Sequence, residues 1–390
     1  MSSRCVVFLA FGVNPRRNAR NGAEVRAYQN LTTFRRLGIE VLVVADSTQK
    51  REWDDDGPVE FIDGFRPQVF LDLCVNWKYR KDMQRVVAQT IDTREACVFC
   101  EHWHSLAIAP HAALTIYSCH DLESKLTPIR WFASDKVLTT RRRLYLWSVI
   151  QVERRLIRQS SCTVCVSESE ARYVEEKYHK PACYLPIVAS ELEAKPIAAL
   201  SGQPKMWFYG GSSATANKLM LRHLRESLFE PLRRLLPDTE FHQIGSTGTY
   251  EAGLRAWLEQ HFVTHGFVER PDTLFQQGDI CLIPYEHDTG FRTKLPELLS
   301  LGVIPAGYDV SFVCCPELVA GWNCIVGRTP SELASKLYDV VGNIYDQERL
   351  VRNCLETAKQ WFSRDAMDRR FRSLLDRVGA SYFGDLTKRS

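Results

Sequence analysis

Apolar and polar positions alternate along this chain in a repeating order. A short run rich in Val, Ile, Phe and Cys is followed each time by a longer amphipathic stretch, which is typical of β-strand and α-helix units around a parallel sheet. In the first amphipathic stretch, Val25, Tyr28 and Leu31 fall near helical spacing, and Gly38 supplies a stop. We therefore predict two α/β layers. The predicted strands cover residues 5–11, 39–45, 96–102, 114–118 and 162–167 in the first layer, and 206–210, 239–245, 263–268, 279–285, 303–308 and 324–327 in the second.

A stretch with prolines and no strong period separates the two layers. It reads SELEAKPIAALSGQPK, which suits a linker. We place the first domain at residues 1–188, the linker at 189–204 and the second domain at 205–365. Before the linker, Ser167 with Glu170 three residues later predicts a capping box that opens a helix.

Composition places the chain among ordinary globular proteins. Its 390 residues exceed a single domain of roughly 150 residues, and 45% are apolar and 25% charged. The longest apolar run, Cys5–Val13, is shorter than the ~20 residues of a membrane-spanning helix, and no small-residue cleavage site follows it. The 13 cysteines are scattered through apolar segments. These features predict a cytoplasmic protein with reduced, buried cysteines and no transmembrane helix.

One segment departs from the nearly neutral balance of the chain, whose formal charge is +3. Residues 125–158 hold nine lysines and arginines against Asp135 and Glu153. Such a cationic segment with interleaved aromatic residues suits an anionic membrane surface, a lipid-linked acceptor or nucleic acid. A solvated helix face explains the same pattern equally well. The interleaved aromatic residues are Trp131, Phe132, Tyr145 and Trp147.

The segment DTGFRTKLPELLSLGVIPAGY carries the most informative chemistry. After a strand that ends at Tyr285, a loop holds Arg292 and Lys294, and Pro296 and Glu297 open a helix. Two cations just before a helix N-terminus favour an anion such as phosphate, and a carboxylate beside it can accept hydrogen bonds from sugar hydroxyls. The residues alone also fit an ordinary helix start with a charged loop.

The stretch GFRTKLPELLSLGVIP resembles the signature of family-four glycosyltransferases with the GT-B fold. Upstream, GFVERPDTLFQQGDICLIPYEHDTG resembles the stretch that leads into that signature, and PELVAGWNCIVGRTPSELASKL resembles the pattern that closes it. WFYGGSSATANKLMLRHL, YSCHDLES and VCVSESEARYV resemble further stretches of the family. The resemblance covers about 300 residues in family order. It implies two Rossmann-like domains facing across a cleft, with a C-terminal helix at 366–390 that returns to the first domain.

The resemblance also assigns residues to a donor site. Arg292 and Lys294 would hold the diphosphate of a nucleotide sugar, Glu297 would bind the ribose, and His120 would contact the donor sugar from the first domain. Gly290 and Phe291 belong to the same loop signature. A tight turn after the first strand of the second domain would cradle phosphate. That turn contains Gly210, Gly211 and Ser212.

Two positions depart from the family pattern. Many members carry a second Glu near the donor sugar, where this chain has Thr289, and often two adjacent glycines, where it has Asn21 and Gly22. Gly22 still lets backbone approach a ligand closely, so we keep it on the acceptor side. Glu101 and His102, at a predicted strand end, join it there.

Two clusters imitate metal sites. Cys97, Cys100, His102 and His104 have ligand-like spacing, but a strand points alternate residues to opposite faces, so we predict buried packing for the cysteines. Cys314 and Cys315 are likewise predicted to pack. Residues 54–56, three aspartates in a WDDDGP turn, are predicted to be solvated. We expect no metal site and no bound cofactor.

The resemblance therefore implies a glycosyltransferase that moves a sugar from a nucleoside-diphosphate donor to a hydroxyl, with retention and without metal. A saccharide or lipid-linked glycan is the first choice of acceptor. A hydroxylated nucleobase in nucleic acid, or a non-catalytic sugar-nucleotide binder, is the alternative. The location is predicted to be cytoplasmic, with residues 125–158 offering a peripheral contact to an anionic membrane.

Overall fold

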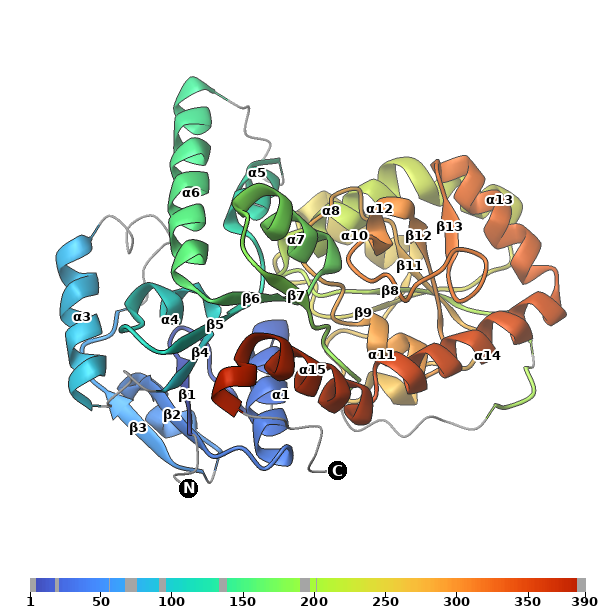
Figure 1. Cartoon of the computed structure of the whole chain (residues 1–390). Helices are drawn as coiled ribbons and strands as arrows, with labels where there is room; N and C mark the ends of the chain where they lie inside the picture. Colours follow the sequence, from blue (N-terminus) through green and yellow to red (C-terminus); the bar gives the residue numbers. More distant parts are fainter. Residues whose placement is uncertain are drawn as a thin grey trace.

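The computed structural model describes residues 5–17, 21–55, 57–66, 76–90, 96–132, 139–189, 197–200 and 202–383. All strand pairs among them are parallel, and they form two separate sheets, as predicted (Figure 1). The first sheet has the order β3-β2-β1-β4-β5-β6-β7, and the second has the order β10-β9-β8-β11-β12-β13. The strands are β1 (Val6–Ala10), β2 (Val41–Asp46), β3 (Val59–Ile62), β4 (Cys97–Glu101), β5 (Leu114–Cys119), β6 (Cys162–Cys165), β7 (Ala182–Tyr184), β8 (Met206–Tyr209), β9 (Phe241–Ile244), β10 (Val263–Thr264), β11 (Ile280–Ile283), β12 (Ile304–Tyr308) and β13 (Ile325–Gly327).

Helices cover the sheets because the strands are apolar on both faces. In β1, Val7 and Leu9 enter one core cluster, while Val6 and Phe8 enter another on the opposite face of the sheet. The helices are α1 (Gly22–Arg36), α3 (Trp77–Thr90), α4 (His102–Ile108), α5 (Glu123–Phe132), α6 (Thr140–Gln159), α7 (Glu168–Tyr173), α8 (Thr215–His223), α9 (Phe229–Leu235), α10 (Ala252–His261), α11 (Leu295–Ser300), α12 (Asp309–Phe312), α13 (Pro330–Val341), α14 (Ile344–Trp361) and α15 (Arg364–Phe383). Short 3₁₀ and π turns lie at Ser47–Glu52, Val174–Tyr178, Leu224–Leu228 and Pro271–Thr273.

The last helix, α15, belongs to the core of the first domain. The Phe371 ring lies 4.7 Å from that of Phe34 on α1 and 6.2 Å from that of Phe99 on β4, measured between centroids. Met367 and Leu375 are fully buried in the same cluster. The chain therefore crosses from the first domain to the second and returns, which confirms the predicted return of the C-terminal helix (Figure 1).

The structure corrects several expectations. Of the strand predicted at 263–268, only β10 forms, and β3 and β7 were not predicted. Asp55 is not solvated, because its carboxylate pairs with Arg35 and its side chain is 7% exposed. Residues 91–95, 133–138 and 384–390 of the predicted segments lie outside the described residues. No helix in the described ranges is both long and apolar enough to cross a membrane.

Candidate active site

The β11–α11 loop (residues 284–294) of the second domain touches the first domain at two glycines. A Cβ atom added at Gly22, at the start of α1, would lie 2.8 Å from Thr293 Cγ2. A Cβ atom added at Gly290 would collide with the Asp121 carboxylate, in the turn between β5 and α5. Since Cβ atoms do not approach this closely, both contacts depend on glycine. The loop predicted to bind an anion thus lies directly against the first domain.

Two side chains of the first domain reinforce this contact through Asp288. Lys125 Nζ lies 2.8 Å from Asp288 Oδ2, and Ser169 Oγ donates to Asp288 Oδ1 at 2.5 Å. Lys125 was predicted to belong to the cationic segment 125–158, but it is committed to the interdomain contact. That segment is therefore not one continuous surface.

Glu170, on α7, links the same two segments. Its Oε1 accepts hydrogen bonds from the backbone N–H groups of Leu122 at 3.4 Å and Gly290 at 3.1 Å. Burial of this side chain, reinforced by the charge of Asp121, raises the pKa of Glu170 above its usual range. The capping box predicted with Ser167 is wrong, because Ser167 makes no side-chain cap bond and Glu170 points away to these amides. Through these two bonds Glu170 holds the β5–α5 turn against the β11–α11 loop.

On the first domain, a buried carboxylate orients His120. His120 follows β5, and its Nε2 bonds to Glu101, which ends β4 and is fully buried. Glu101 also accepts from Asn30 Nδ2 and Ser118 Oγ, each at 2.8 Å. Burial alone would raise the pKa of Glu101, but His120, Arg26 and Asn30 together lower it below its usual value. Since an ionised carboxylate only accepts, His120 Nε2 carries the proton. Glu101, predicted on the acceptor side, lies behind His120.

His102 and His104 extend this face. His102 has a φ of 68°, a left-handed conformation that costs an L-residue roughly 1–2 kcal/mol. Its Nδ1 lies 2.8 Å from His104 Nδ1, and burial lowers the pKa of His102 well below its usual value. Gly12, after β1, has a φ of 78°, and a Cβ atom there would collide with the His104 ring. Such strain is typical of functional sites, and here it lies at the carboxyl ends of β1 and β4.

On the second domain, Arg292 rests on a tyrosine ring and on backbone oxygens. Its guanidinium carbon lies 3.8 Å from the centroid of the Tyr285 ring, and Nη2 donates to the Thr289 carbonyl oxygen at 2.8 Å. Its Nε is buried with no hydrogen-bond partner. Among the described residues Arg292 forms no ion pair. Its charge is therefore open to an anion.

Lys294 and Glu297 meet around Tyr209, at the end of β8. The Lys294 ammonium donates to the Tyr209 carbonyl oxygen and lies 4.4 Å from the Tyr209 ring centroid. The Tyr209 hydroxyl donates to Glu297 Oε2 at 3.2 Å. Burial lowers the pKa of Lys294 to about 8 and raises the pKa of Glu297. The cation and carboxylate predicted to hold the diphosphate and ribose are thus neighbours.

The turn after β8 is shaped by close backbone packing. A Cβ atom added at Gly245 would lie 2.5 Å from Gly211 N, and the Gly210 carbonyl accepts from Gln243 Nε2 at 3.2 Å. Ser212 is fixed to the neighbouring turn by its backbone N–H, which donates to the Ser246 carbonyl at 2.7 Å. The turn precedes α8, whose first amides have no side-chain cap. The first amides of α8 are therefore the backbone donors that follow this turn, since the Gly210 and Ser212 amides already donate within the fold.

Two other residues of the loop signature are buried. Phe291 is 8% exposed and packs in the core of the second domain. Thr289, where many family members carry Glu, is also buried, and its hydroxyl lies 2.9 Å from the Tyr285 hydroxyl. Thr289 thus supports the ring on which Arg292 stacks.

The remaining predicted clusters are structural. Cys97, Cys100, Cys314 and Cys315 are buried, as predicted. In the described ranges, no group of three or more His, Cys, Asp or Glu side chains is arranged to hold a metal ion.

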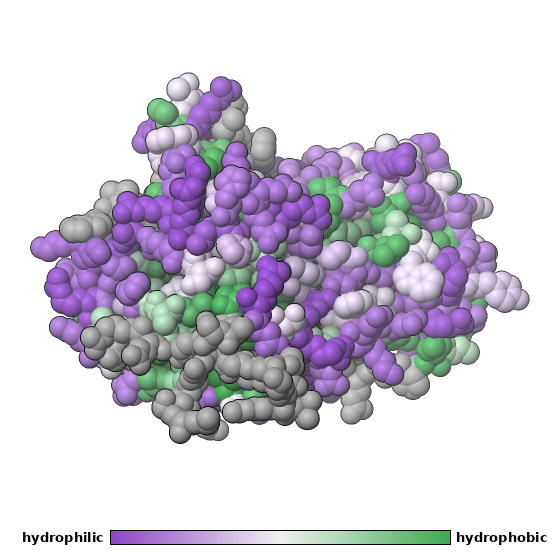
Figure 2. All heavy atoms as spheres, in the orientation of Figure 1, coloured by the Kyte–Doolittle hydropathy of each residue, from purple (hydrophilic) through white to green (hydrophobic). Residues whose placement is uncertain are grey.

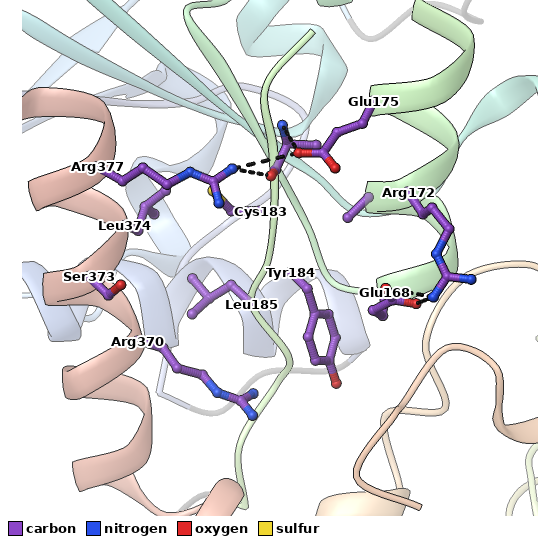
Figure 3. A pocket seen from close by; sticks show the side chains of 12 residues that line it. Glu168, Arg172, Glu175, Cys183, Tyr184, Leu185, Arg370, Ser373, Leu374 and Arg377 are labelled. Atoms are coloured by element: carbon purple, nitrogen blue, oxygen red, sulfur yellow. Dashed lines mark hydrogen bonds and ion pairs between the residues drawn. The ribbon is translucent and has the colours of Figure 1, made fainter. Parts of the chain in front are cut away.

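A cavity of about 400 Å³ lies where α7, β7 and α15 meet (Figure 3). Arg172 pairs with Glu168 at 2.8 Å, and Arg377 lies 3.6 Å from Glu175 while donating to the Ala182 carbonyl oxygen at 2.7 Å. Since these charges are already compensated, we assign the cavity to the crossing between domains and place no ligand in it.

Sequence reasoning missed the residues that support the site. Asn30, Ser118 and Glu170 are polar residues inside helix and strand patterns, and only the fold brings them together. Gly12 directly follows the first predicted strand. Its position at a strand carboxyl end could therefore have marked it as a residue near the site.

Comparison with known proteins gives one partial family match. The family model described as Glycosyltransferase Family 4 matches residues 20–186, which is less than half of the chain. No curated protein matches the sequence.

Solved structures match the whole chain. Sucrose-phosphate synthase from Thermosynechococcus elongatus aligns with a TM-score of 0.68 and 11% identity over 97% of this chain and 100% of that chain. Anabaena Alr3699/HepE in complex with UDP aligns with a TM-score of 0.66 and 13% identity, over 96% of this chain and 100% of that chain. A mutant of S. aureus TarM, in complex with fondaparinux, α-GlcNAc-glycerol and UDP, aligns with a TM-score of 0.67 and 7% identity. The alignment covers 96% of this chain and 100% of that chain. At these identities the likeness shows the fold alone. Together the comparisons show the GT-B fold over the whole chain and a match to the Glycosyltransferase Family 4 model over residues 20–186.

Proposed function

We propose that this enzyme transfers a sugar from a UDP-sugar to a hydroxyl of a saccharide or lipid-linked glycan, with retention at the anomeric carbon. The observation that carries the proposal is the contact between the two faces. Arg292 and Lys294, without ion-pair partners among the described residues, stand on a loop that touches the turn after His120. The donor diphosphate fits the cations, and its sugar then faces His120.

The second domain would bind the nucleotide part. Charge-assisted bonds from Arg292 and Lys294 would neutralise the diphosphate, and Glu297 would accept from the ribose hydroxyls. The uncapped first amides of α8, which follow the turn at Gly210, Gly211 and Ser212, would add backbone donors. The structure of HepE has been solved in complex with UDP-glucose, which supports UDP as the nucleotide of the donor.

The first domain would hold the acceptor and the transferred sugar. In the transfer step, the bond from the anomeric carbon to the diphosphate oxygen breaks, and a bond from that carbon to the acceptor oxygen forms. The acceptor proton passes to the departing diphosphate, so no protein base is required. Arg292 and Lys294 stabilise the charge that develops on the diphosphate, the role that a metal ion plays in other enzymes. We therefore propose transfer without a metal or other cofactor, in the cytoplasm.

Saccharide acceptors are supported by TarM, whose solved complex contains fondaparinux. Gly22 and His102 lie on the side of the site where such an acceptor would enter. A hydroxylated nucleobase is the alternative acceptor, and steep loss of binding with added salt would favour it.

A non-catalytic binder is the alternative of a different class. Thr289 favours it, because it replaces a Glu of the family with a buried hydroxyl.

The test is calorimetric titration of the protein with UDP-, GDP-, TDP- and ADP-sugars, repeated on Arg292→Ala. We expect saturable binding of a UDP-sugar, weakened by about tenfold to a hundredfold in the variant, because one charge-assisted phosphate contact is lost. Arg255→Ala, an exposed residue paired with Glu259 on α10, is the matched control and should bind normally. Equal affinity in Arg292→Ala would refute the diphosphate assignment. Sugar release or transfer above the solvent rate would exclude the non-catalytic alternative.

A further inference from the structure

The N-terminal part of α6 projects from the first domain, and α5 packs against this helix (Figure 1). In α6 the first buried residue is Val149, so the residues from Thr140 to Ser148 have no buried member. We call these nine residues, together with Arg130 and Trp131 of α5, the arm.

Large apolar side chains on the arm are open to solvent. Leu144 is 64% exposed, Trp147 is 61% exposed and Tyr145 is 42% exposed. Leu144 and Trp147 are three residues apart and are neighbours on the helix surface. Figure 2 shows hydrophobic and strongly hydrophilic residues side by side on this projection. An exposed apolar cluster of this kind marks an interaction surface.

The charges of the arm all have one sign. Arg141, Arg142 and Arg143 precede Leu144, and no acidic residue occurs between Thr139 and Ser148. Arg142 lies over the Trp131 ring, 5.8 Å from its centroid. Together with Tyr145, these residues border a hollow of about 520 Å³. Apolar side chains flanked by cations fit the headgroup region of a bilayer with anionic lipids.

We propose that the arm docks the enzyme on an anionic membrane surface. A second copy of the chain fits less well, because a symmetric contact would bring the arginines of two arms together. Nucleic acid also fits less well, because phosphate contacts would leave the aliphatic Leu144 without a partner. Lys125, a cation of segment 125–158 outside the arm, is not needed for docking because it pairs with Asp288.

The arm is joined to the site through α5. Its helix α5 begins three residues after His120, and its ten residues span about 15 Å. Lys125, near the start of α5, contacts the β11–α11 loop. Docking at the far end of α5 would therefore leave His120 about one ten-residue helix away from the docked residues. This consequence favours a lipid-linked acceptor and rests on the proposed function, whereas docking itself does not.

The test is sedimentation of the full chain with vesicles of phosphatidylcholine, with and without phosphatidylglycerol, in the absence of sugar nucleotide. We expect binding only with phosphatidylglycerol. The double variant Leu144→Ser with Trp147→Ser should bind roughly tenfold more weakly, as should Arg141→Ser with Arg143→Ser. Trp322→Ser changes a residue that is 50% exposed in the second domain and should bind like the wild type.

Three outcomes would overturn the proposal. They are absence of wild-type binding, equal loss in Trp322→Ser, and loss of a dimer or of nucleic-acid binding, rather than of vesicle binding, in the arm variants. Circular dichroism checks that each variant folds. UDP titration of the same preparations reports on the donor site separately, so failure of docking and failure of the proposed function are distinguishable.

Discussion

The two faces of the site hold their charges in opposite ways. On the first domain, His120 bonds to a buried Glu101 that Asn30 and Ser118 hold in place. On the second, Arg292 and Lys294 rest on tyrosine rings and backbone oxygens, with no ion pair among the described residues. A charge that is already paired orients a group, whereas an unpaired charge receives a ligand. Turnover should therefore depend mainly on the first face, and nucleotide affinity on the second.

The strongest test of this division is Glu101→Gln. The amide keeps the shape of the carboxylate but lacks the charge that fixes His120. We expect turnover to fall by about a hundredfold, since misplacing a reacting group by 1 Å costs that much, while UDP affinity changes less than about twofold. Glu153→Gln is the matched control, because Glu153 is another buried carboxylate of the first domain that accepts from Ser124. Lost UDP affinity in Glu101→Gln, or full turnover, would contradict the assignment of turnover to the first face and nucleotide affinity to the second.

The second face is tested through the charge of Lys294. Burial lowers its pKa to about 8, so the charge is present below that pH and lost above it. UDP affinity should fall by up to about tenfold per pH unit above 8, because one proton is taken up on binding. Lys294→Arg stays charged and should show a flat profile from pH 7 to 9 by calorimetry.

Lys336→Arg, an exposed residue paired with Glu332, serves as the control and should follow the wild type. A common slope for the wild type and Lys294→Arg would show that another group causes the pH dependence.

The sequence predicted the second face better than the first. Arg292, Lys294 and Glu297 lie within six consecutive residues, so one motif contains them. The predicted strand before them places that motif at the carboxyl end of the sheet. The support of His120 comes from α1, β4 and β5, through Asn30, Glu101 and Ser118. Hydrogen bonds between residues on different strands and helices depend on the order of the strands in the sheet. No local stretch of the sequence reveals that order. Glu170 was misassigned for the same reason, since a local cap and a long-range contact use the same residue type.

The contact between the faces should itself respond to pH. The pKa of Glu170 is raised to about 8, first by burial and then by Asp121, while the backbone amides and Lys125 act in the opposite direction. Because closing the contact raises this pKa, it takes up a proton, so the contact is strongest below the ordinary pKa of glutamate, about 4.3, and weakens as the pH rises to about 8. Glu170→Gln stays neutral and keeps an accepting oxygen.

Hydrogen exchange of the β11–α11 loop, without nucleotide and corrected for intrinsic rates, measures this effect. Between pH 5 and 8, wild-type protection should fall by up to about tenfold per pH unit and level off above about pH 8, whereas Glu170→Gln should keep it. Glu168→Gln, on the same helix and paired with Arg172, should behave like the wild type. A loop whose exchange is the same in all three proteins is not held by Glu170.

The smallest expected effect tests whether the faces must touch at all. Gly22→Ala places a Cβ atom 2.8 Å from Thr293 Cγ2, and Thr293→Ser removes that methyl group. Alanine is a better helix former than glycine, so α1 itself is not weakened. We expect Gly22→Ala to lower kcat/KM about fivefold, Thr293→Ser to have little effect, and the double variant to recover. Recovery would mean that Gly22 serves to let the second domain approach. An equal loss in the Thr293→Ser background would instead place Gly22 against the acceptor, and the first face would then bind substrate as well as orient it.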